Sequence, residues 1–430
     1  MAPWWKKKLP LRGIVLFRGN LPPQPGEFAF LQQQGIAITP EPANDRARWA
    51  LKLAHPEWGE ASLACPRDLQ APPREIIEFQ RLSPAEKERA LLGEVGLFVE
   101  MEPQQGNVLR DRKLLLRYLG AIMAGDGVAA LDMASQLVWS REMLDDELSH
   151  DADLDVEAIF SLHAIYEEDQ PPYWIHSHGL QEIGEFDFDI LDPSEHLDGD
   201  IYRAIAFAIV EQKLIANTEF PLAMPKGTIR PVEIEQFLAQ ADSRYRRQIG
   251  DGFDEMHRKK HYVLCEPESG FFSRLFARGL RPSRFLSHPV ENSMLTFTNE
   301  ATELMAERAR QTYPVLRQLA AEFADLELPV IVKLGYRTDP GSPTEHENLW
   351  FKVEGFAGED IDATLLNQPF FIERMKEGQR SSHSAELLSD WTIMTPAGPI
   401  SPRAQIAARA VRANREKIRQ MMQQAMRQER

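Results

Sequence analysis

The stretch that decides the fold is YWIHSHGLQEIGEFDFDI, residues 173–190. Tyr173–His178 is rich in aromatic and β-branched residues, acidic and apolar side chains alternate over Glu185–Ile190, and Gly184 lies at the turn between the two runs, which predicts two strands. A third run of this kind, Phe160–Tyr166, comes before the pair. Three consecutive strands with turn residues between them predict an antiparallel meander.

Outward from this meander, strand-like runs and helical patterns follow one another without a regular βαβ alternation. This order predicts an α+β fold: antiparallel sheets with packed helices in an N-terminal region, a smaller C-terminal α+β domain and a C-terminal helical tail. The expected strands are at residues 13–17, 49–53, 61–65, 95–100, 329–336 and 349–353, and the expected helices at 109–124, 200–216 and about 299–323.

The chain has 430 residues, which is more than one ordinary core accommodates, so several domains are expected. We divide it into an N-terminal α+β region at 1–265 with room for two subdomains, a linker rich in Arg, Phe and Pro at 266–290, an α+β domain at 291–402 and a basic helical tail at 403–430. The tail presents an apolar stripe, which predicts that it docks on the protein; binding a partner or a second copy is the alternative. The stripe consists of Ala407, Val411, Ile418, Met422 and Ala425.

Composition narrows the class of protein. The net charge is −16, so nucleic acid is not the expected partner, because phosphate binding needs clustered Lys and Arg. The two cysteines, Cys65 and Cys265, are too far apart in sequence for a metal knuckle or a redox pair, and a reducing compartment fits best. We find no signal peptide and no run of the ~20 apolar residues that a membrane span needs, and therefore expect a cytoplasmic protein.

The sharpest chemical feature is the pair His176 and His178. Residues i and i+2 of a strand point to the same face, so both imidazoles could reach one metal ion. On the following strand Asp189 could supply a carboxylate, which would give a catalytic zinc site with a position left for water. His163, on the preceding strand, is a candidate third nitrogen ligand.

A second interpretation of the same residues needs no metal. Two histidines and an acidic strand edge can simply fill out a sheet surface, since acidic residues alternating with aromatic ones are common on half-buried strands. The sequence favours this interpretation and no cofactor, with zinc as the alternative. Phosphate-binding loops of the Gly-x-x-x-x-Gly-Lys-Ser/Thr and Gly-x-Gly-x-x-Gly types are missing from the sequence, as is the Gly-x-Ser-x-Gly motif of serine hydrolases.

Four short motifs in the C-terminal part occur in an order that resembles the YegJ-like domain, a bacterial domain of unknown function. The resemblance spans residues 291–402, and it departs from the pattern at Gln379, where an Asp is usual. The motifs are Glu347–Val353, Leu365–Pro369, Lys376–Gly378 and Ser389–Trp391.

Upstream, Trp174–Leu180 followed by Gly184, Asp187 and Asp189 is similar to a second bacterial family of unknown function, which carries a His-Ser/Thr-His-Gly-Leu stretch. That family is often fused to a YegJ-like domain. Neither resemblance implies an activity or a catalytic residue.

Together these features favour an uncharacterised bacterial cytoplasmic protein of several domains. Its expected role is non-enzymatic: binding an unidentified protein partner or regulating it, as an immunity protein does. Candidate binding residues in the C-terminal domain are His346, Trp350, Asp390 and Trp391, of which the two Trp and His346 could line a small pocket, although two buried indoles in a compact sheet explain them as well. The alternative is a metal-dependent hydrolase with a zinc site at His176 and His178.

Overall fold

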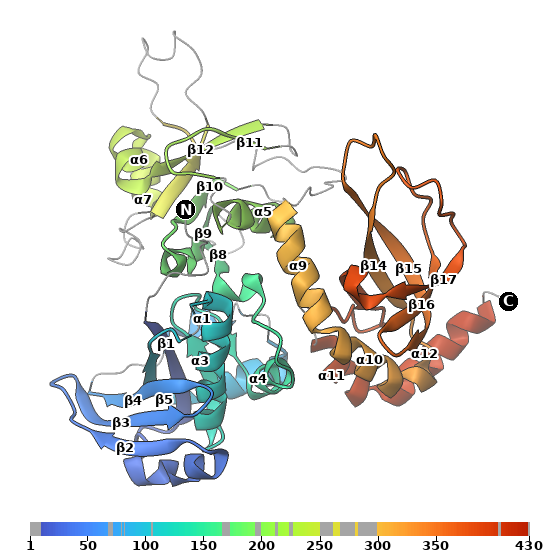
Figure 1. The fold of residues 1–430 in the computed structure, drawn as a ribbon. Helices are drawn as coiled ribbons and strands as arrows, with labels where there is room; N and C mark the ends of the chain where they lie inside the picture. Colours follow the sequence, from blue (N-terminus) through green and yellow to red (C-terminus); the bar gives the residue numbers. More distant parts are fainter. Residues whose placement is uncertain are drawn as a thin grey trace, which may run out of the picture. The chain divides into compact units, whose positions relative to one another are not determined.

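The computed structural model of the chain resolves into two compact units (Figure 1). The first consists of Met1–Asp145 and Val156–Thr298, and the second of Asp146–Asp155 and Asn299–Arg430. The residues that the structure describes are 10–67, 72–78, 80, 82–104, 106–165, 173–193, 199–210, 214–222, 227–249, 261–266, 280–282, 299–402 and 406–428. The predicted linker at 266–290 lies mostly outside this set.

A seven-stranded antiparallel sheet forms the N-terminal part of the first unit, with strand order β2-β3-β4-β5-β1-β6-β7. Its strands are β1 (Leu11–Arg18), β2 (Ala37–Glu41), β3 (Ala47–His55), β4 (Gly59–Pro66), β5 (Gly93–Met101), β6 (Gly127–Asp132) and β7 (Val138–Trp139). The associated helices are η2 (Pro25–Gln34), α1 (Arg74–Glu78), α2 (Pro84–Ala90), α3 (Val108–Met123), α4 (Arg141–Leu148) and η3 (Val156–Ile159).

Helix α3 packs against β1, β5 and β6 of this sheet and is buried along almost its whole length. It begins where the side chain of Asn107 accepts hydrogen bonds from the backbone N–H groups of Leu109 and Arg110, a usual N-cap arrangement. The helix therefore carries polar side chains into the interior of the unit, and Arg112 is one of them.

A second sheet in the same unit contains the predicted meander. Its order is β11-β12-β13-β10-β9-β8, and β8, β9 and β10 are consecutive antiparallel neighbours, as expected. The sheet is not purely antiparallel, because β13 pairs with β10 in parallel. Its strands are β8 (Ser161–Ile165), β9 (Trp174–His178), β10 (Asp187–Leu191), β11 (Phe220–Leu222), β12 (Gly227–Glu233) and β13 (His261–Cys265), with helices η4 (Leu180–Ile183), α5 (Gly199–Val210), α6 (Ile234–Gln240) and α7 (Ser243–Ile249).

The second unit contains a five-stranded antiparallel sheet of order β17-β16-β15-β14-β18. The strands are β14 (Val330–Arg337), β15 (His346–Ala357), β16 (Asp360–Leu365), β17 (Arg380–Ser384) and β18 (Leu388–Ile393). The helices are α9 (Asn299–Gln311), α10 (Tyr313–Glu322), η7 (Ala324–Leu326), η8 (Ala385–Leu387), α11 (Ile406–Ala413) and α12 (Arg415–Gln428). The predicted α+β class and the helical tail are confirmed.

The single helix expected at about 299–323 is wrong in one respect, since the structure divides it into α9 and α10 at Thr312. Pro314 explains the break: proline lacks the N–H that a continuous helix would use, and its ring clashes with the preceding turn. The hydroxyl of Thr312 donates to the carbonyl oxygen of Arg308 at this point.

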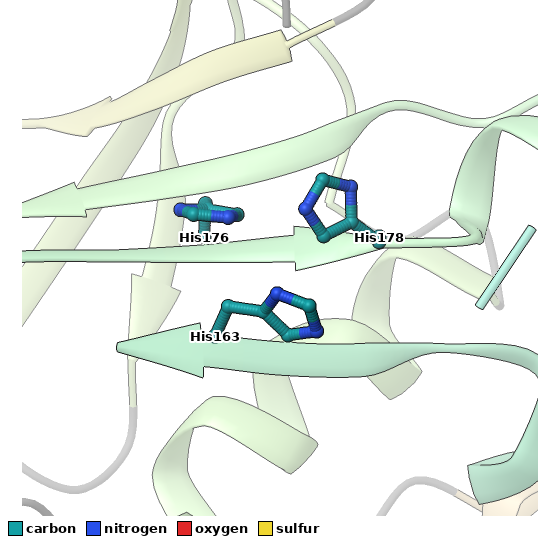
Figure 2. Close-up of side chains that lie close together, drawn as sticks. All are labelled: His163, His176 and His178. Carbon is teal, nitrogen blue, oxygen red and sulfur yellow. The ribbon is translucent and has the colours of Figure 1, made fainter. Parts of the chain in front are cut away.

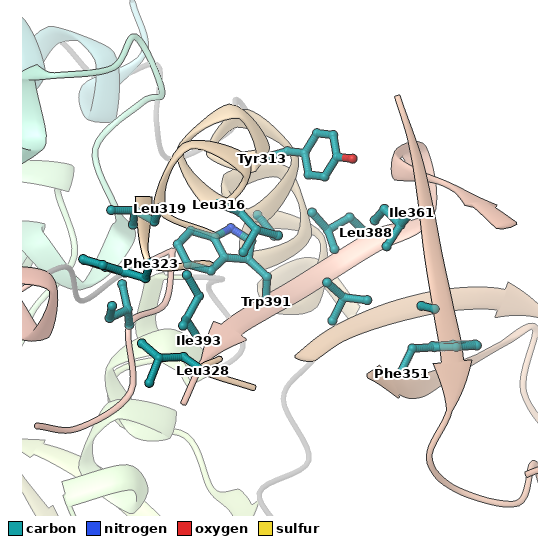
Figure 3. Close-up of a cluster of buried hydrophobic side chains, with 14 of the residues drawn as sticks. Tyr313, Leu316, Leu319, Phe323, Leu328, Phe351, Ile361, Leu388, Trp391 and Ile393 are labelled. Carbon is teal, nitrogen blue, oxygen red and sulfur yellow. The ribbon is translucent and has the colours of Figure 1, made fainter. Parts of the chain in front are cut away.

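The core of the second unit lies between these helices and one face of the sheet. Trp391 is fully buried there, beside Leu316, Phe323 and Ile393 (Figure 3). The C-terminal tail adds Ala407, Val411 and Ile418 to the same cluster, so the tail docks through its apolar stripe.

Segment 146–155 enters the second unit through buried polar contacts, although the sequence-based division includes it in 1–265. The guanidinium of Arg308 is 6% exposed and forms an ion pair with Glu147 at 2.9 Å, and it also donates to the carbonyl oxygens of Asp153 and Pro402. The side chain of Gln311 accepts a hydrogen bond from the backbone N–H of Asp153. Across the part of the chain that the structure describes, none of the helices combines the length and the apolar character required to cross a bilayer.

Candidate metal site

Three histidines come together on neighbouring strands of the second sheet. His176 and His178 are i and i+2 on β9, and His163 on the edge strand β8 stands directly opposite His176 in the antiparallel register. Directly opposed residues of an antiparallel pair share one face of the sheet, so the register itself brings the three imidazoles together (Figure 2).

The three rings lie close enough together for a metal ion to be considered. One ligand nitrogen from each histidine can be chosen so that all three lie within 4.8 Å of one another. The ring centroids are 5.5 Å apart for His163 and His176, 4.8 Å for His163 and His178, and 4.7 Å for His176 and His178. In a tetrahedral zinc site with Zn–N bonds of about 2.0–2.1 Å, two ligand nitrogens are about 3.3 Å apart and their ring centroids about 5.2 Å apart. Small side-chain rotations would therefore close the cluster around an ion.

The surroundings of His163 favour one of its nitrogens as a ligand. Its Nε2 atom lies 3.0 Å from the hydroxyl of Ser161, which can accept the Nε2 proton. That tautomer leaves the lone pair on Nδ1, and Figure 2 shows a nitrogen of His163 directed toward the strand that carries His176 and His178. A hydrogen bond from the second nitrogen to a neighbouring acceptor is what metal-binding histidines usually have.

Burial separates the site from an ordinary surface cluster. His176 and His178 are 4% and 7% exposed, whereas His163 on the edge strand is half-buried. The two histidines of β9 are thus more buried than the half-buried side chains that the sequence predicts.

Asp189 is buried beside the cluster but is not one of the grouped ligands among the described residues. Its two carboxylate oxygens have other partners: Oδ1 accepts from the indole N–H of Trp174 at 2.9 Å, and Oδ2 lies 3.1 Å from Nδ1 of His261. Asp189 thus places a negative charge next to the three imidazoles, which favours a cation there. The structure brings His163 into the position that the sequence analysis gave first to Asp189.

Asp187, two residues earlier on β10, supports the end of β9. Its Oδ1 accepts hydrogen bonds from the hydroxyl of Ser177 at 2.8 Å and from the backbone N–H of Leu180 at 3.2 Å. Burial raises the pKa of Asp187 to about 6, although His261 and these two donors oppose the rise. The carboxyl therefore reaches the midpoint of its ionisation near pH 6 and is mostly ionised at pH 7.

His261 is the neighbouring residue that sequence reasoning missed. It is 1% exposed on β13, and its ring centroid lies 6.1 Å from that of His178, farther than the three cluster members lie from one another. It belongs to the surroundings of the cluster and is held there by Asp189. The sequence contains no local signal for it, because β13 lies about 70 residues after β10 and joins it in parallel.

The C-terminal candidates do not form one pocket. Trp391 is fully buried in the core, and its indole N–H donates to Thr312 at 3.0 Å. Trp350 is 36% exposed and pairs across strands with Lys333, which in turn pairs with Asp390; the ammonium group of Lys333 lies 5.2 Å from the Trp350 ring centroid. The two indoles therefore lie on opposite faces of the sheet, and His346 is exposed at the start of β15.

Comparison with known protein families finds a DUF2314 domain at residues 299–401, a family described as an uncharacterized protein conserved in bacteria. This confirms that the C-terminal region carries a bacterial domain of unknown function, as its resemblance to the YegJ-like domain implied. No curated protein and no solved structure matches the chain. The resemblance of the region around His176 to a second bacterial family stays a prediction.

Proposed function

We propose that the first unit binds one zinc ion through His163, His176 and His178 and that the protein is a metal-dependent hydrolase. The observation that carries this proposal is the convergence of three imidazole nitrogens to within 4.8 Å on two adjacent strands. Imidazole is a preferred ligand of zinc, and a set of three protein ligands leaves the fourth position of a tetrahedral ion for water.

Hydrolysis is the reaction that such a site supports best. A bound zinc ion would lower the pKa of a coordinated water to about 7 and would polarise a substrate carbonyl or phosphoryl oxygen. The chain's own residues would hold and orient the ligands: Ser161 fixes the tautomer of His163, and Asp189 supplies nearby negative charge. The half-buried edge strand β8 is the side from which a substrate would approach.

Elemental analysis tests the zinc site directly. The full-length protein is stripped with a chelator, reloaded with zinc, freed of excess metal and measured for zinc per chain. We expect about one zinc per chain for the wild type and a loss of most of it in His176→Ala and His178→Ala. His346→Ala, an exposed histidine in the second unit, is the matched control and should bind as the wild type does. A wild-type protein that stays zinc-free after reloading would rule the proposal out.

Protein binding is the second candidate function, and it concerns the second unit. Among the large apolar side chains exposed there are Trp350 at 36%, Leu366 at 43%, Phe370 at 85% and Phe371 at 37%. The segments that carry them are neighbours, because the backbone N–H groups of Phe370 and Phe371 both donate to Glu347, and the N–H of Leu366 donates to the carbonyl oxygen of Trp350. Exposed aromatic side chains of this kind are typical of protein-binding surfaces.

The surface and the zinc site can be tested separately. We expect Phe370→Ser combined with Phe371→Ser to abolish binding of a partner protein while zinc content stays at the wild-type level. Binding unchanged in this variant would argue against the surface. The proposed setting is the cytoplasm, which agrees with Cys65 and Cys265 both being buried free thiols.

A further inference from the structure

A single buried cation touches the segments that flank the two histidine-bearing strands. The guanidinium of Arg112, on α3, is 1% exposed. It forms ion pairs with Asp132 on β6 at 3.0 Å and with Glu182 in η4, and it donates a hydrogen bond to the carbonyl oxygen of Ala158 at 3.3 Å.

The partners of Arg112 lie next to the two strands that carry the histidines. Ala158 lies in η3, which leads into β8 and His163, whereas Glu182 lies four residues after His178 at the end of β9. Arg112 therefore joins the segment entering one strand to the segment leaving the other. The two strands it joins are the two that carry the metal ligands.

The backbone at Gly179 packs too closely for β9 to shift along β8. Gly179, directly after His178, has φ +114°, and a Cβ atom there would clash with the carbonyl oxygen of Ile159 and lie 3.1 Å from the Cα of Phe160. A one-residue shift between β8 and β9 would turn every side chain of the shifted strand to the other face and separate His163 from His176. The close approach at Gly179 and the Arg112 contacts oppose this shift together.

The contact of Arg112 with Asp132 and Glu182 is an interaction between opposite charges. Burial alone would lower the pKa of Arg112, but Asp132 and Glu182 raise it above its ordinary value, so the guanidinium stays charged. Burial raises the pKa of Glu182, and Asp132 adds to that rise while Arg112 opposes it. The buried Asp132 and the partly buried Glu182 thus share one cation, and Asp132 is further fixed by the backbone N–H groups of Ala134 and Ser135.

We propose that Arg112 is a positioning residue for the zinc site: by binding Glu182 and the Ala158 carbonyl, it holds β8 and β9 in the register that brings His163 to His176 and His178. This inference rests on the proposed function. Arg112 would not touch the ion and would act only through the strands. Residues that orient metal ligands in this way typically change metal affinity by about 10–100-fold when they are replaced.

The test compares Arg112→Met and Glu182→Gln with Arg110→Met, a replacement of an exposed arginine on the same helix. Zinc affinity of the full-length protein is measured by competition with a chromophoric chelator, and ligand geometry by the visible absorption spectrum of the cobalt-substituted protein. Thermal unfolding is recorded for each variant. Glu182→Gln keeps the shape of the contact and provides the measurement if Arg112→Met does not fold.

We expect Arg112→Met or Glu182→Gln to weaken zinc binding by about 10-fold or more and to change the cobalt spectrum, with Arg110→Met matching the wild type. Folded variants that are less stable but keep wild-type zinc affinity and the wild-type spectrum would show that Arg112 only stabilises the fold, and the inference would be overturned. A wild-type protein that binds neither metal would instead refute the zinc site itself.

Discussion

The indole N–H of Trp391 donates a hydrogen bond of 3.0 Å to the hydroxyl of Thr312, and both residues are fully buried. Thr312 lies at the break between α9 and α10, and Trp391 lies on β18, so this bond fastens the two helices to the sheet. The bond also gives the buried indole N–H an acceptor, and without one this donor would destabilise the folded state.

Replacing Thr312 by Val should therefore lower the free energy of unfolding by about 1–3 kcal/mol, since the shape is kept while the acceptor is lost. Urea denaturation followed by tryptophan fluorescence measures the change. Thr312→Ser retains the hydroxyl and serves as the control, with a smaller loss expected. Equal stability of the Val variant and the wild type would contradict the role of this bond.

Arg308→Ala should lower the free energy of unfolding more than Arg310→Ala, a replacement on the same helix. Removing Arg308 breaks the ion pair with the largely buried Glu147, and breaking a buried ion pair from one side costs about 3–5 kcal/mol. Arg310, 38% exposed and paired with Glu307, is the control, and Arg310→Ala should cost about 1 kcal/mol or less. Chemical denaturation of both Ala variants gives the comparison, and similar values for the two would be evidence against the buried role of Arg308.

Gly179 should tolerate no side chain. Gly179→Ala combines a left-handed backbone with a clash against Ile159, and we expect both a loss of several kcal/mol of stability and weaker zinc binding. Gly358→Ala is informative beside it, because Gly358 also has a positive φ, +64°, but its Cβ would meet nothing within 4 Å. That variant should lose only about 1–2 kcal/mol and keep its zinc. Thermal unfolding with metal analysis distinguishes the two.

His383 should make the second unit sensitive to acid. Burial lowers the pKa of His383 below 6.5, although Ala363 and Asp362 oppose the shift. As the pH falls through 6.5, the unfolded chain binds a proton before the folded protein does, so the free energy of unfolding decreases. His383→Gln should reduce this dependence between pH 7 and pH 5.

The measurement is urea denaturation across that pH range, with chelator present throughout so that metal release does not contribute. His346→Gln, which changes an exposed histidine, should follow the wild-type slope. A His383→Gln slope identical to that of the wild type would contradict the prediction.

Local pattern was enough to predict the meander β8-β9-β10, because alternation and turn residues are written in consecutive positions. The predicted meander in turn placed His176 and His178 on one face of the sheet and made His163 a candidate ligand of the same metal site. The same logic could not predict His261, since parallel pairing of β13 with β10 joins segments about 70 residues apart, and nothing in either segment specifies the other.

The pairing of the strands also determines on which face of the sheet the C-terminal candidate residues Trp350 and Trp391 lie. Trp350 and Trp391 are both large, amphipathic residues on strands, and composition alone does not tell on which side of a sheet each one lies. The register of β14 with β15 and β18 separates them, with Trp350 opposite Lys333 and Trp391 opposite Val332. The division of α9 from α10, in contrast, had a visible signal in Pro314.

Segment 146–155 has a consequence for how the molecule is made. Arg308 and Glu147 are 161 positions apart. During synthesis, the acidic segment 146–155 therefore leaves the ribosome long before Arg308, its partner in the ion pair, has been translated. The second unit therefore cannot reach its final form as each part emerges and must wait until the distant arginine is available.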